Sequence, residues 1–298
     1  MYRSVMLPLD GSRFSEQALP LASKLAGACG ASLRIVHVHQ PHTEPDWDLV
    51  TPFRYEGVVE AEREWEHDAV KLEQRYLSQH VGAECKVLEG EVVPTLEQEI
   101  ETSNPDLIVM ATHGRGGLSR AWLGSVADTL IRDIHKPILL IRAEEKQTTE
   151  PATLQTAHLL VPLDGSPLAE SVIKHALAIA EQHTTRITLL RVVSPAYVTT
   201  EFNGIVQSDS LLRERVDAAH EYLNRVATQL GVEGYLMETD VVVATSAAAA
   251  ILDYAERNDT NVICMATHGR SGVKRLLLGS VTDKVVRASD RPVLLYRP

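Results

Sequence analysis

The sequence has little material for cysteine chemistry or for membrane insertion. Its cysteines, Cys29, Cys85 and Cys264, are only three in number, lie far apart and form no Cys-x-x-Cys pair. This excludes a disulfide framework and is typical of reduced, mostly buried thiols in a cytoplasmic protein. No apolar run approaches the ~18 residues of a membrane span. The first residues, Met1 to Val5, lead straight into a predicted strand, so we expect a cytoplasmic chain without a signal peptide or membrane segment.

Basic residues are also scarce. The chain has 29 Lys and Arg against 40 Asp and Glu, which gives a net charge of −11. Sequence-independent binding of nucleic acid requires a basic face, so we expect no nucleic-acid partner. The Walker A sequence Gly-x4-Gly-Lys-[Ser/Thr] is absent, which excludes the P-loop way of placing a lysine on the phosphates. No acid pair in the sequence indicates a two-metal site.

What the chain does contain is an internal duplication. Residues 111–125 and 266–280 share Ala-Thr-His-Gly-Arg-x-Gly at their start and Leu-Gly-Ser at their end, 155 residues apart. Pro-Leu-Asp-Gly-Ser occurs at 8–12 and again at 162–166. With 298 residues the chain has room for two ordinary domains. The predicted organisation is domain 1 over 1–143, a polar linker over 144–156 and domain 2 over 157–298.

Hydrophobic patterning predicts the same alternation of strands and helices in each half. Because strands alternate with helices, we predict an α/β fold in which each domain is flavodoxin-like or Rossmann-like, with a five-stranded parallel sheet covered by helices on both faces. The expected strands are 5–9, 33–38, 85–88, 106–111 and 138–141, then 158–163, 186–193, 235–243, 261–266 and 292–296. The expected helices of the first half are 13–29, 58–81, 92–102 and 125–134.

Both repeated motifs follow predicted strands. Asp10 comes after strand 1, and His113 and Gly114 come after strand 4. In open sheets of this kind a ligand binds beyond the carboxyl ends of the strands, where the strand order reverses. If strands 1 and 4 are neighbours, both motifs face one crevice. The last strand of each half, at a sheet edge, should pair with its counterpart, which makes the chain an intramolecular pseudo-dimer.

The segment after strand 4 resembles the universal stress protein family. Nucleotide-binding members of that family have Gly, two residues, Gly, nine residues, then Gly followed by Ser or Thr. Gly114 and Gly124-Ser125 match in the first half, and Gly269 and Gly279-Ser280 match in the second. The first glycine is replaced by Ala111 and Ala266, and alanine disfavours positive φ. The resemblance covers both halves, so the chain looks like a tandem universal stress protein.

This resemblance implies a stress-response protein that binds ATP, with or without Mg²⁺, in one or both halves. The glycines would leave room for phosphates, and the helix that begins at Ser125 would favour an anion. Asp10 and Asp164 would bond ribose hydroxyls, and the backbone of Val38 and Val192 would contact adenine. The remaining candidate site residues are Ala111, His113, Gly114, Arg115, Gly117 and Gly124 in the first half, and Ala266, His268, Gly269, Arg270, Gly272, Gly279 and Ser280 in the second.

Structural explanations compete with these assignments. Ser125 with Asp128, and Ser280 with Asp283, have the spacing of capping boxes. Ser166 before Pro167 is a predicted helix cap, and the glycines suit turns. The histidines His37, His39 and His42 invite a metal interpretation, but no nearby cysteine or acid completes a preformed set of ligands.

Two rival functions remain open, a slow ATPase that uses the same crevice and an interaction scaffold that has lost its ligand. We expect no catalytic residue and no metal site. Segments 39–57 and 194–208 would lie over the crevices as lids and change the binding of an unknown protein partner. The family also implies a homodimer.

Overall fold

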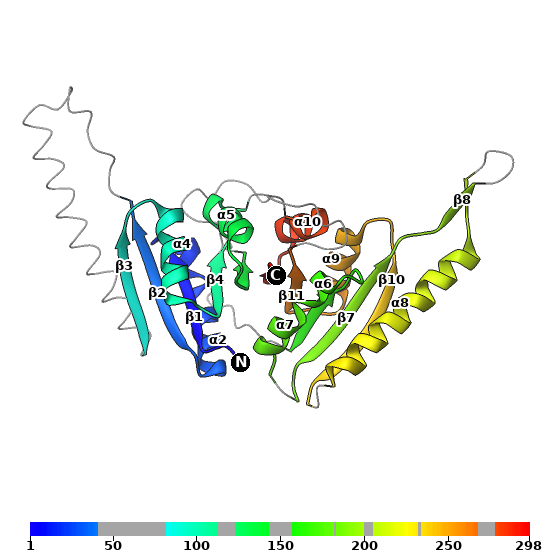
Figure 1. Ribbon diagram of the computed structural model, residues 1–298, viewed down its shortest axis with the longest axis horizontal. Helices are drawn as coiled ribbons and strands as arrows, with labels where there is room; N and C mark the ends of the chain where they lie inside the picture. The colour runs from blue at the N-terminus through cyan, green and yellow to red at the C-terminus, as the bar shows by residue number, and fades with distance from the viewer. Residues whose placement is uncertain are drawn as a thin grey trace, which may run out of the picture.

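Ten strands form one continuous sheet that runs through both halves of the chain (Figure 1). None of the helices in the described part of the chain has both the length and the apolar composition of a membrane-spanning segment. The computed structural model describes residues 1–40, 82–112, 123–142, 157–181, 183–199, 205–231, 234–267 and 278–298.

The first half follows the predicted order of strands and helices within the described residues. The single helix predicted over 13–29 is wrong, because Pro20 lacks the amide hydrogen that would bond the carbonyl of Glu16, and the segment divides into two helices. The predicted helix 58–81, like most of the loop 39–57, lies outside the described residues. The elements are β1 (Ser4–Leu9), α1 (Arg13–Glu16), α2 (Leu19–Cys29), β2 (Ser32–His39), β3 (Ala83–Glu89), α4 (Val92–Ser103), β4 (Leu107–Ala111), α5 (Ser125–Asp133) and β5 (Ile138–Ile141).

The second half repeats this order and adds a short hairpin. The segment 194–208, which was expected to act as a lid, contains two paired antiparallel strands, β8 and β9. Figure 1 shows β8 projecting past the end of β7, at the outer end of the molecule. The elements are β6 (His158–Pro162), α6 (Pro167–Glu170), α7 (Ile173–Ile179), β7 (Arg186–Val193), β8 (Tyr197–Thr199), β9 (Ile205–Gln207), α8 (Asp209–Leu230), β10 (Leu236–Val243), α9 (Ala247–Arg257), β11 (Val262–Ala266), α10 (Ser280–Ala288) and β12 (Val293–Tyr296).

The order of the strands shows how the two halves join. The sheet runs β10-β7-β6-β11-β12-β5-β4-β1-β2-β3. Adjacent strands of this sheet are parallel except at its centre, where β5 and β12 are antiparallel and Leu139 lies opposite Leu294. The predicted pairing of the two last strands is therefore confirmed. Each half has the Rossmann-like order, in which its first strand lies between the second and the fourth.

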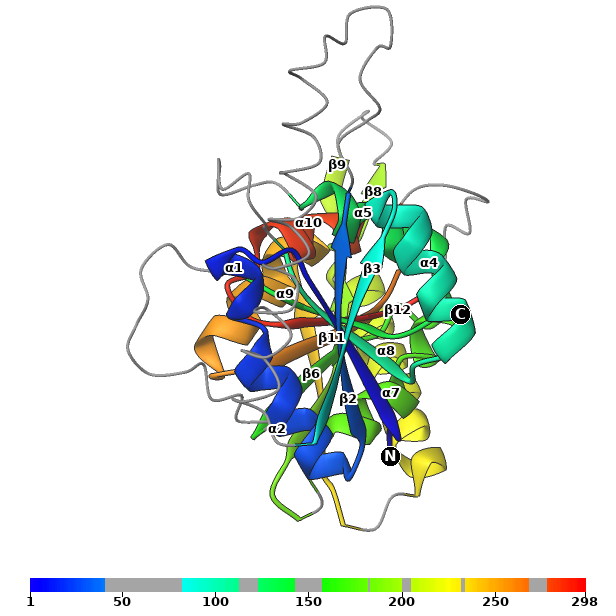
Figure 2. The ribbon, with the colours of Figure 1, turned by 90° about the vertical axis from the view of Figure 1, so that its left-hand side faces the viewer.

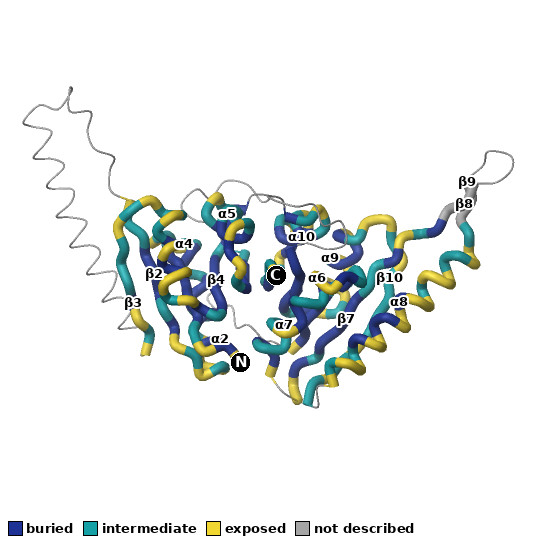
Figure 3. The backbone as a smooth tube through the Cα atoms, viewed as in Figure 1, coloured by how far each residue is buried: buried dark blue, intermediate teal, exposed yellow. Residues whose placement is uncertain are grey.

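Helices cover both faces of the sheet, as predicted (Figure 2). On one face α2, α7 and α8 bury side chains such as Leu25, Ile173 and Leu223. On the other face α4, α5, α9 and α10 form a second core cluster. Alternate strand residues supply the two cores, with Leu7 in the first and Met6 in the second. Figure 3 shows that the central strands are buried, whereas β3 and β10 at the two ends are partly exposed.

Side chains join the halves on both faces of the sheet. On the α7 face, the hydroxyl of Tyr2 lies 3.1 Å from Nδ1 of His175, and the His175 ring packs on Tyr296 with centroids 4.1 Å apart. On the other face, Arg287 of α10 lies 3.9 Å from Asp128 of α5. Contacts across all three layers therefore connect the halves.

His175 makes this junction sensitive to acid. Burial, with the Lys174 charge adding to it, lowers the pKa of His175 to about 4 from 6.5. Its Nε2 atom is buried and has no hydrogen-bond partner within the described residues. As the pH falls below 6.5, His175 becomes protonated in the unfolded chain, whereas in the folded chain it stays neutral until the pH is about 4. The free energy of unfolding therefore declines over that pH window.

We expect a loss of about 1–2 kcal/mol in unfolding free energy across this window, after allowance for solvent screening of the partly exposed ring. Urea unfolding of the parent and of His175→Gln at several pH values would measure it. The variant should lose this component of the pH dependence, while the contribution of the carboxylates stays. Equal pH slopes for the two proteins would show that His175 is not the sensitive group.

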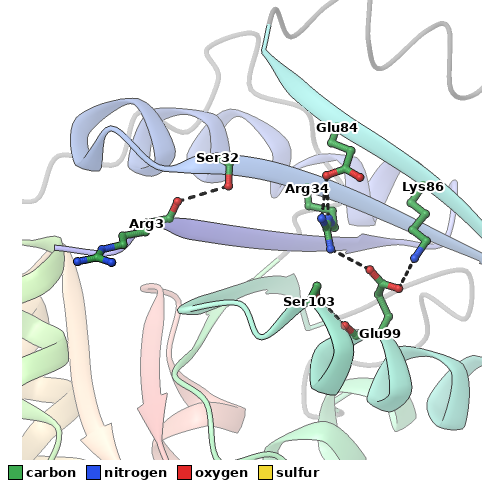
Figure 4. Close-up of polar contacts among 7 residues, drawn as sticks. All are labelled: Arg3, Ser32, Arg34, Glu84, Lys86, Glu99 and Ser103. Carbon is green, nitrogen blue, oxygen red and sulfur yellow. Dashed lines mark hydrogen bonds and ion pairs between the residues drawn. The ribbon is translucent and has the colours of Figure 1, made fainter.

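A buried carboxylate ties α4 to the outer strands of the first half (Figure 4). Glu99 is 5% exposed and accepts from Arg34 of β2 at 3.1 Å and from Lys86 of β3 at 2.6 Å. Arg34 also pairs with Glu84 at 2.9 Å. A buried carboxylate that is paired on both oxygens fixes a helix in position, so we interpret this network as structural.

Candidate functional site

The repeated motifs meet at the carboxyl ends of the central strands of each half. β1 lies between β2 and β4, and β6 lies between β7 and β11. Strand order therefore reverses at β1 and at β6, which is where open α/β sheets bind ligands. The condition set by the sequence, that strands 1 and 4 are neighbours, is met in both halves, and α1 also contacts β4.

Asp10 and Asp164 begin equivalent turns at the ends of β1 and β6. The Oδ1 atom of each aspartate accepts the amide N–H of the serine two residues later, Ser12 or Ser166, at 2.9 Å. Each serine then caps the short helix that follows, so the predicted cap at Ser166 is confirmed. The glycines inside the turns have φ of 74° and 86°, which L side chains rarely adopt. The turns hold both partly exposed carboxylates at the strand ends.

Gly124 and Gly279 bring two longer helices to the same edge of the sheet. The amide of Gly124 donates to the carbonyl of Thr112, and that of Gly279 to Thr267, each at 2.7 Å. Both glycines are N-caps, and no side chain caps either helix in the described part of the chain. The amides of the first turns, with the positive end of the helix dipole, therefore face the crevice edge.

The predicted capping boxes are wrong. Because each glycine is tied to a threonine carbonyl, the glycine is the cap and the serine becomes the first residue of the helix. Asp128 instead pairs with Arg132 at 2.9 Å, and Asp283 pairs with Arg287 at 2.8 Å. Each aspartate is paired with the arginine four residues later in its helix. Its charge therefore competes less with an anion at the helix start than predicted. The exposed Ser125 remains at the start of α5.

Gly124 has a packing role as well. Its φ is −57°, so other residues are compatible with its backbone. A Cβ there, however, would lie 3.0 Å from the carbonyl oxygen of Thr112. The glycine therefore permits a close backbone approach whether or not a ligand binds.

The alanines that replace the first glycine of the motif sit in regular strands. Ala111 ends β4 opposite Ile141, and Ala266 ends β11 opposite Tyr296. Neither has a positive φ, so the expected conflict between alanine and the backbone does not arise. In the second half the hydroxyl of Thr282 donates to the carbonyl of Ala266 at 3.0 Å.

The backbone of Val38 and Val192 is directed toward the crevice. The carbonyl of His39 accepts from Gly90, beside β3, and that of Val193 accepts from Ala244, beside β10. Consecutive residues of a strand direct their backbone groups to opposite sides. Val38 and Val192 therefore present theirs toward β1 and β6, which have already ended at that level.

His37 has a structural contact. Its Nδ1 atom lies 2.8 Å from the carbonyl oxygen of Leu9, and the side chain is buried. Among the described residues no group of three His, Cys, Asp or Glu side chains is arranged for a metal ion. His42 lies outside those residues, as do the site candidates His113, Gly114, Arg115, Gly117, His268, Gly269, Arg270 and Gly272.

Sequence reasoning missed two residues beside the second crevice. Arg191 and Tyr222 pack together, with the guanidinium carbon 5.0 Å from the ring centroid. The signal for Arg191 was present in the repeat, because Arg191 follows His37 by the same 154 residues that separate Asp10 and Asp164. Tyr222 gave no such signal, since it lies far from the repeated motifs in sequence.

The family model for the universal stress protein family matches residues 1–142 and again 156–297. The chain belongs to the universal stress protein family. It carries that domain twice. A universal stress protein of Mycobacterium tuberculosis is 28% identical over 98% of this chain and 96% of its own length.

Solved universal stress proteins agree with this fold. One from Archaeoglobus fulgidus covers 99% of this chain and 98% of its own with a TM-score of 0.68 and 19% identity. A universal stress protein in complex with cAMP covers 48% of this chain at 20% identity, with a TM-score of 0.33. The latter is too distant to locate a ligand here.

Proposed function

We propose that this universal stress protein binds an adenine nucleotide, ATP in the first instance, at the carboxyl ends of β1 and β4, of β6 and β11, or of both pairs. The nucleotide would regulate a protein partner during stress. The observation that carries the proposal is the convergence, twice in one chain, of an aspartate turn and a glycine-capped helix start at the reversal of strand order.

The two ends of this site suit the two ends of a nucleotide. Asp10 and Asp164 supply carboxylate oxygens, which accept from ribose hydroxyls. The helix starts at Ser125 and Ser280 supply amides and a positive dipole, which favour phosphate. Any Mg²⁺ would enter with the triphosphate, whose oxygens it prefers.

The proposal is tested by mass spectrometry of small molecules released when freshly purified protein is denatured, followed by thermal unfolding with added ligands. At a concentration of ATP one hundred times its Kd, the melting temperature should rise by about 5 °C, because only the folded state has the crevice. Inorganic phosphate at the same concentration and duplex DNA are the controls. Equal shifts with ATP and phosphate, or tight binding of DNA, would contradict an adenine-nucleotide site.

The last strands of the two halves, β5 and β12, are already paired with each other within the chain. A homodimer would therefore need another surface, and light scattering after gel filtration would detect it. Steady-state release of phosphate from ATP well above background would favour the slow ATPase over the regulator.

A further inference from the structure

The Asp164 turn is supported by a cation, the guanidinium of Arg191. A Cβ built on Gly165, within this turn, would lie 3.2 Å from Cζ of Arg191 and closer still to its Nη1 atom. Gly165 also has a φ of 86°. The guanidinium of Arg191 is therefore packed directly against the backbone of the turn that holds the proposed ribose-binding carboxylate.

The other side of this guanidinium meets helix α8. Arg191 lies over the ring of Tyr222 at 5.0 Å, within the range of a cation–π contact. The hydroxyl of Tyr222 donates to Oε1 of Glu170 at 2.8 Å. Because Glu170 ends the helix that follows the turn, one tyrosine of α8 contacts the turn through two independent routes.

Helix α8 is in turn connected to the outer end of the second half. It packs against β7 and β10 and begins two residues after the hairpin strand β9. Burial of the tyrosine raises its pKa, and the hydrogen bond to Glu170 adds to this rise. Tyr222 is therefore a fixed, protonated donor between the turn and α8 at physiological pH.

The first half has a different side chain at the position that corresponds to Arg191. In the repeat, His37 stands where the second half has Arg191, and its Nδ1 atom lies beside the carbonyl oxygen of Leu9. The two turns therefore have different neighbours at this position, although their motifs are nearly identical.

We propose that Arg191 is a positioning residue that couples ligand binding at the Asp164 turn to helix α8, so that the second crevice transmits occupancy to the outer end of its domain. This inference rests on the proposed nucleotide function. It assigns the regulatory output to the second half, through the path Asp164 turn, Arg191, Tyr222 and α8.

Hydrogen–deuterium exchange of the full chain, with and without millimolar ATP, tests the coupling segment by segment. In the parent, ATP should slow exchange at 163–171 and also at 209–226. Arg191→His, which installs the residue of the first half, should speed exchange at 163–171 about fivefold without ATP, as expected for loss of a cation–π contact. It should abolish the ATP effect at 209–226 while leaving that at 8–16 in the first half unchanged.

Two further variants separate coupling from a general structural effect. Tyr222→Leu removes the ring and should reproduce the result of Arg191→His. Arg225 is exposed and lies over the same ring at 5.7 Å. Arg225→Gln therefore removes a cation from the ring without removing the one at Gly165, and it should behave like the parent.

The outcomes are distinct. If α8 responds to ATP equally in Arg191→His and in the parent, the coupling is overturned. The same holds if ATP slows exchange at the turn of the parent but not in α8. If ATP slows exchange at neither turn, in 8–16 or in 163–171, the proposed nucleotide function itself is wrong, and the coupling falls with it.

Discussion

Leu294→Ala should lower the free energy of unfolding by about 3–5 kcal/mol, the usual cost of emptying a tightly packed leucine site. Leu294 is fully buried in β12 and lies opposite Leu139 of β5, which is also fully buried. The leucines therefore meet where the two half-sheets join. Leu139→Ala should cost a similar amount, and the double variant should cost less than the sum, since the two sites are in contact.

Urea unfolding followed by circular dichroism measures these changes. The matched control is Leu236→Ala, because Leu236 is 55% exposed and should change stability by less than about 0.5 kcal/mol. The junction also predicts one compact particle, so small-angle scattering of the parent should fit joined halves. Two independently tumbling halves, or no effect of either junction variant, would contradict the pairing.

Ser125→Asp should weaken ATP binding in the first half about a hundredfold without destabilising the fold. Ser125 is exposed and is the first residue of α5. An acidic side chain at the start of a helix interacts favourably with the helix dipole and stabilises the helix by about 0.3–1 kcal/mol. The same charge about 5 Å from a phosphate oxygen costs about 3 kcal/mol at an effective dielectric constant of about 20. Ser280→Asp should do the same in the second half.

Substitution of the serines avoids an ambiguity that substitution of the glycines would bring, because a glycine variant can lose binding through a disturbed fold. Gly124→Val is expected to abolish binding too, but its side chain would crowd the carbonyl oxygen of Thr112 and so disturb the helix start directly. Ser125→Asn has nearly the shape of the aspartate without its charge and is the control. Titration calorimetry would resolve the halves through the single and double aspartate variants. Unchanged ATP affinity in the double aspartate variant would show that the helix starts are not part of the binding site.

The repeat and the periodicity were enough to predict most elements of the fold. The strand at 138–141 and the start of the helix at 125 agree with β5 and α5 to the residue. The strand is predicted correctly because a short, continuous apolar run suits a strand that helices cover on both faces. The helix at 13–29 failed because Pro20 removes one hydrogen bond, a local effect that apolar spacing does not record.

The capping boxes failed for a different reason. The spacing of Ser125 and Asp128 was correct for a box, but the cap was decided by a hydrogen bond from Gly124 to Thr112, twelve residues earlier in the chain. Which residue caps a helix depends on what the preceding backbone already bonds. That information becomes available only when β4 and α5 are packed together.

By itself, the sequence determined the duplicated α/β fold, its family and the position of the aspartate turns at the strand ends, because hydrophobic periodicity and repeated motifs are local properties of the chain. The tertiary structure alone decided that Arg191 lies between the Asp164 turn and Tyr222, which are brought together by strand pairing and by the packing of α8 on the sheet. Nothing in the spacing of these residues predicts that contact. The near-identical motifs therefore describe what the two halves share, and packing decides where they differ.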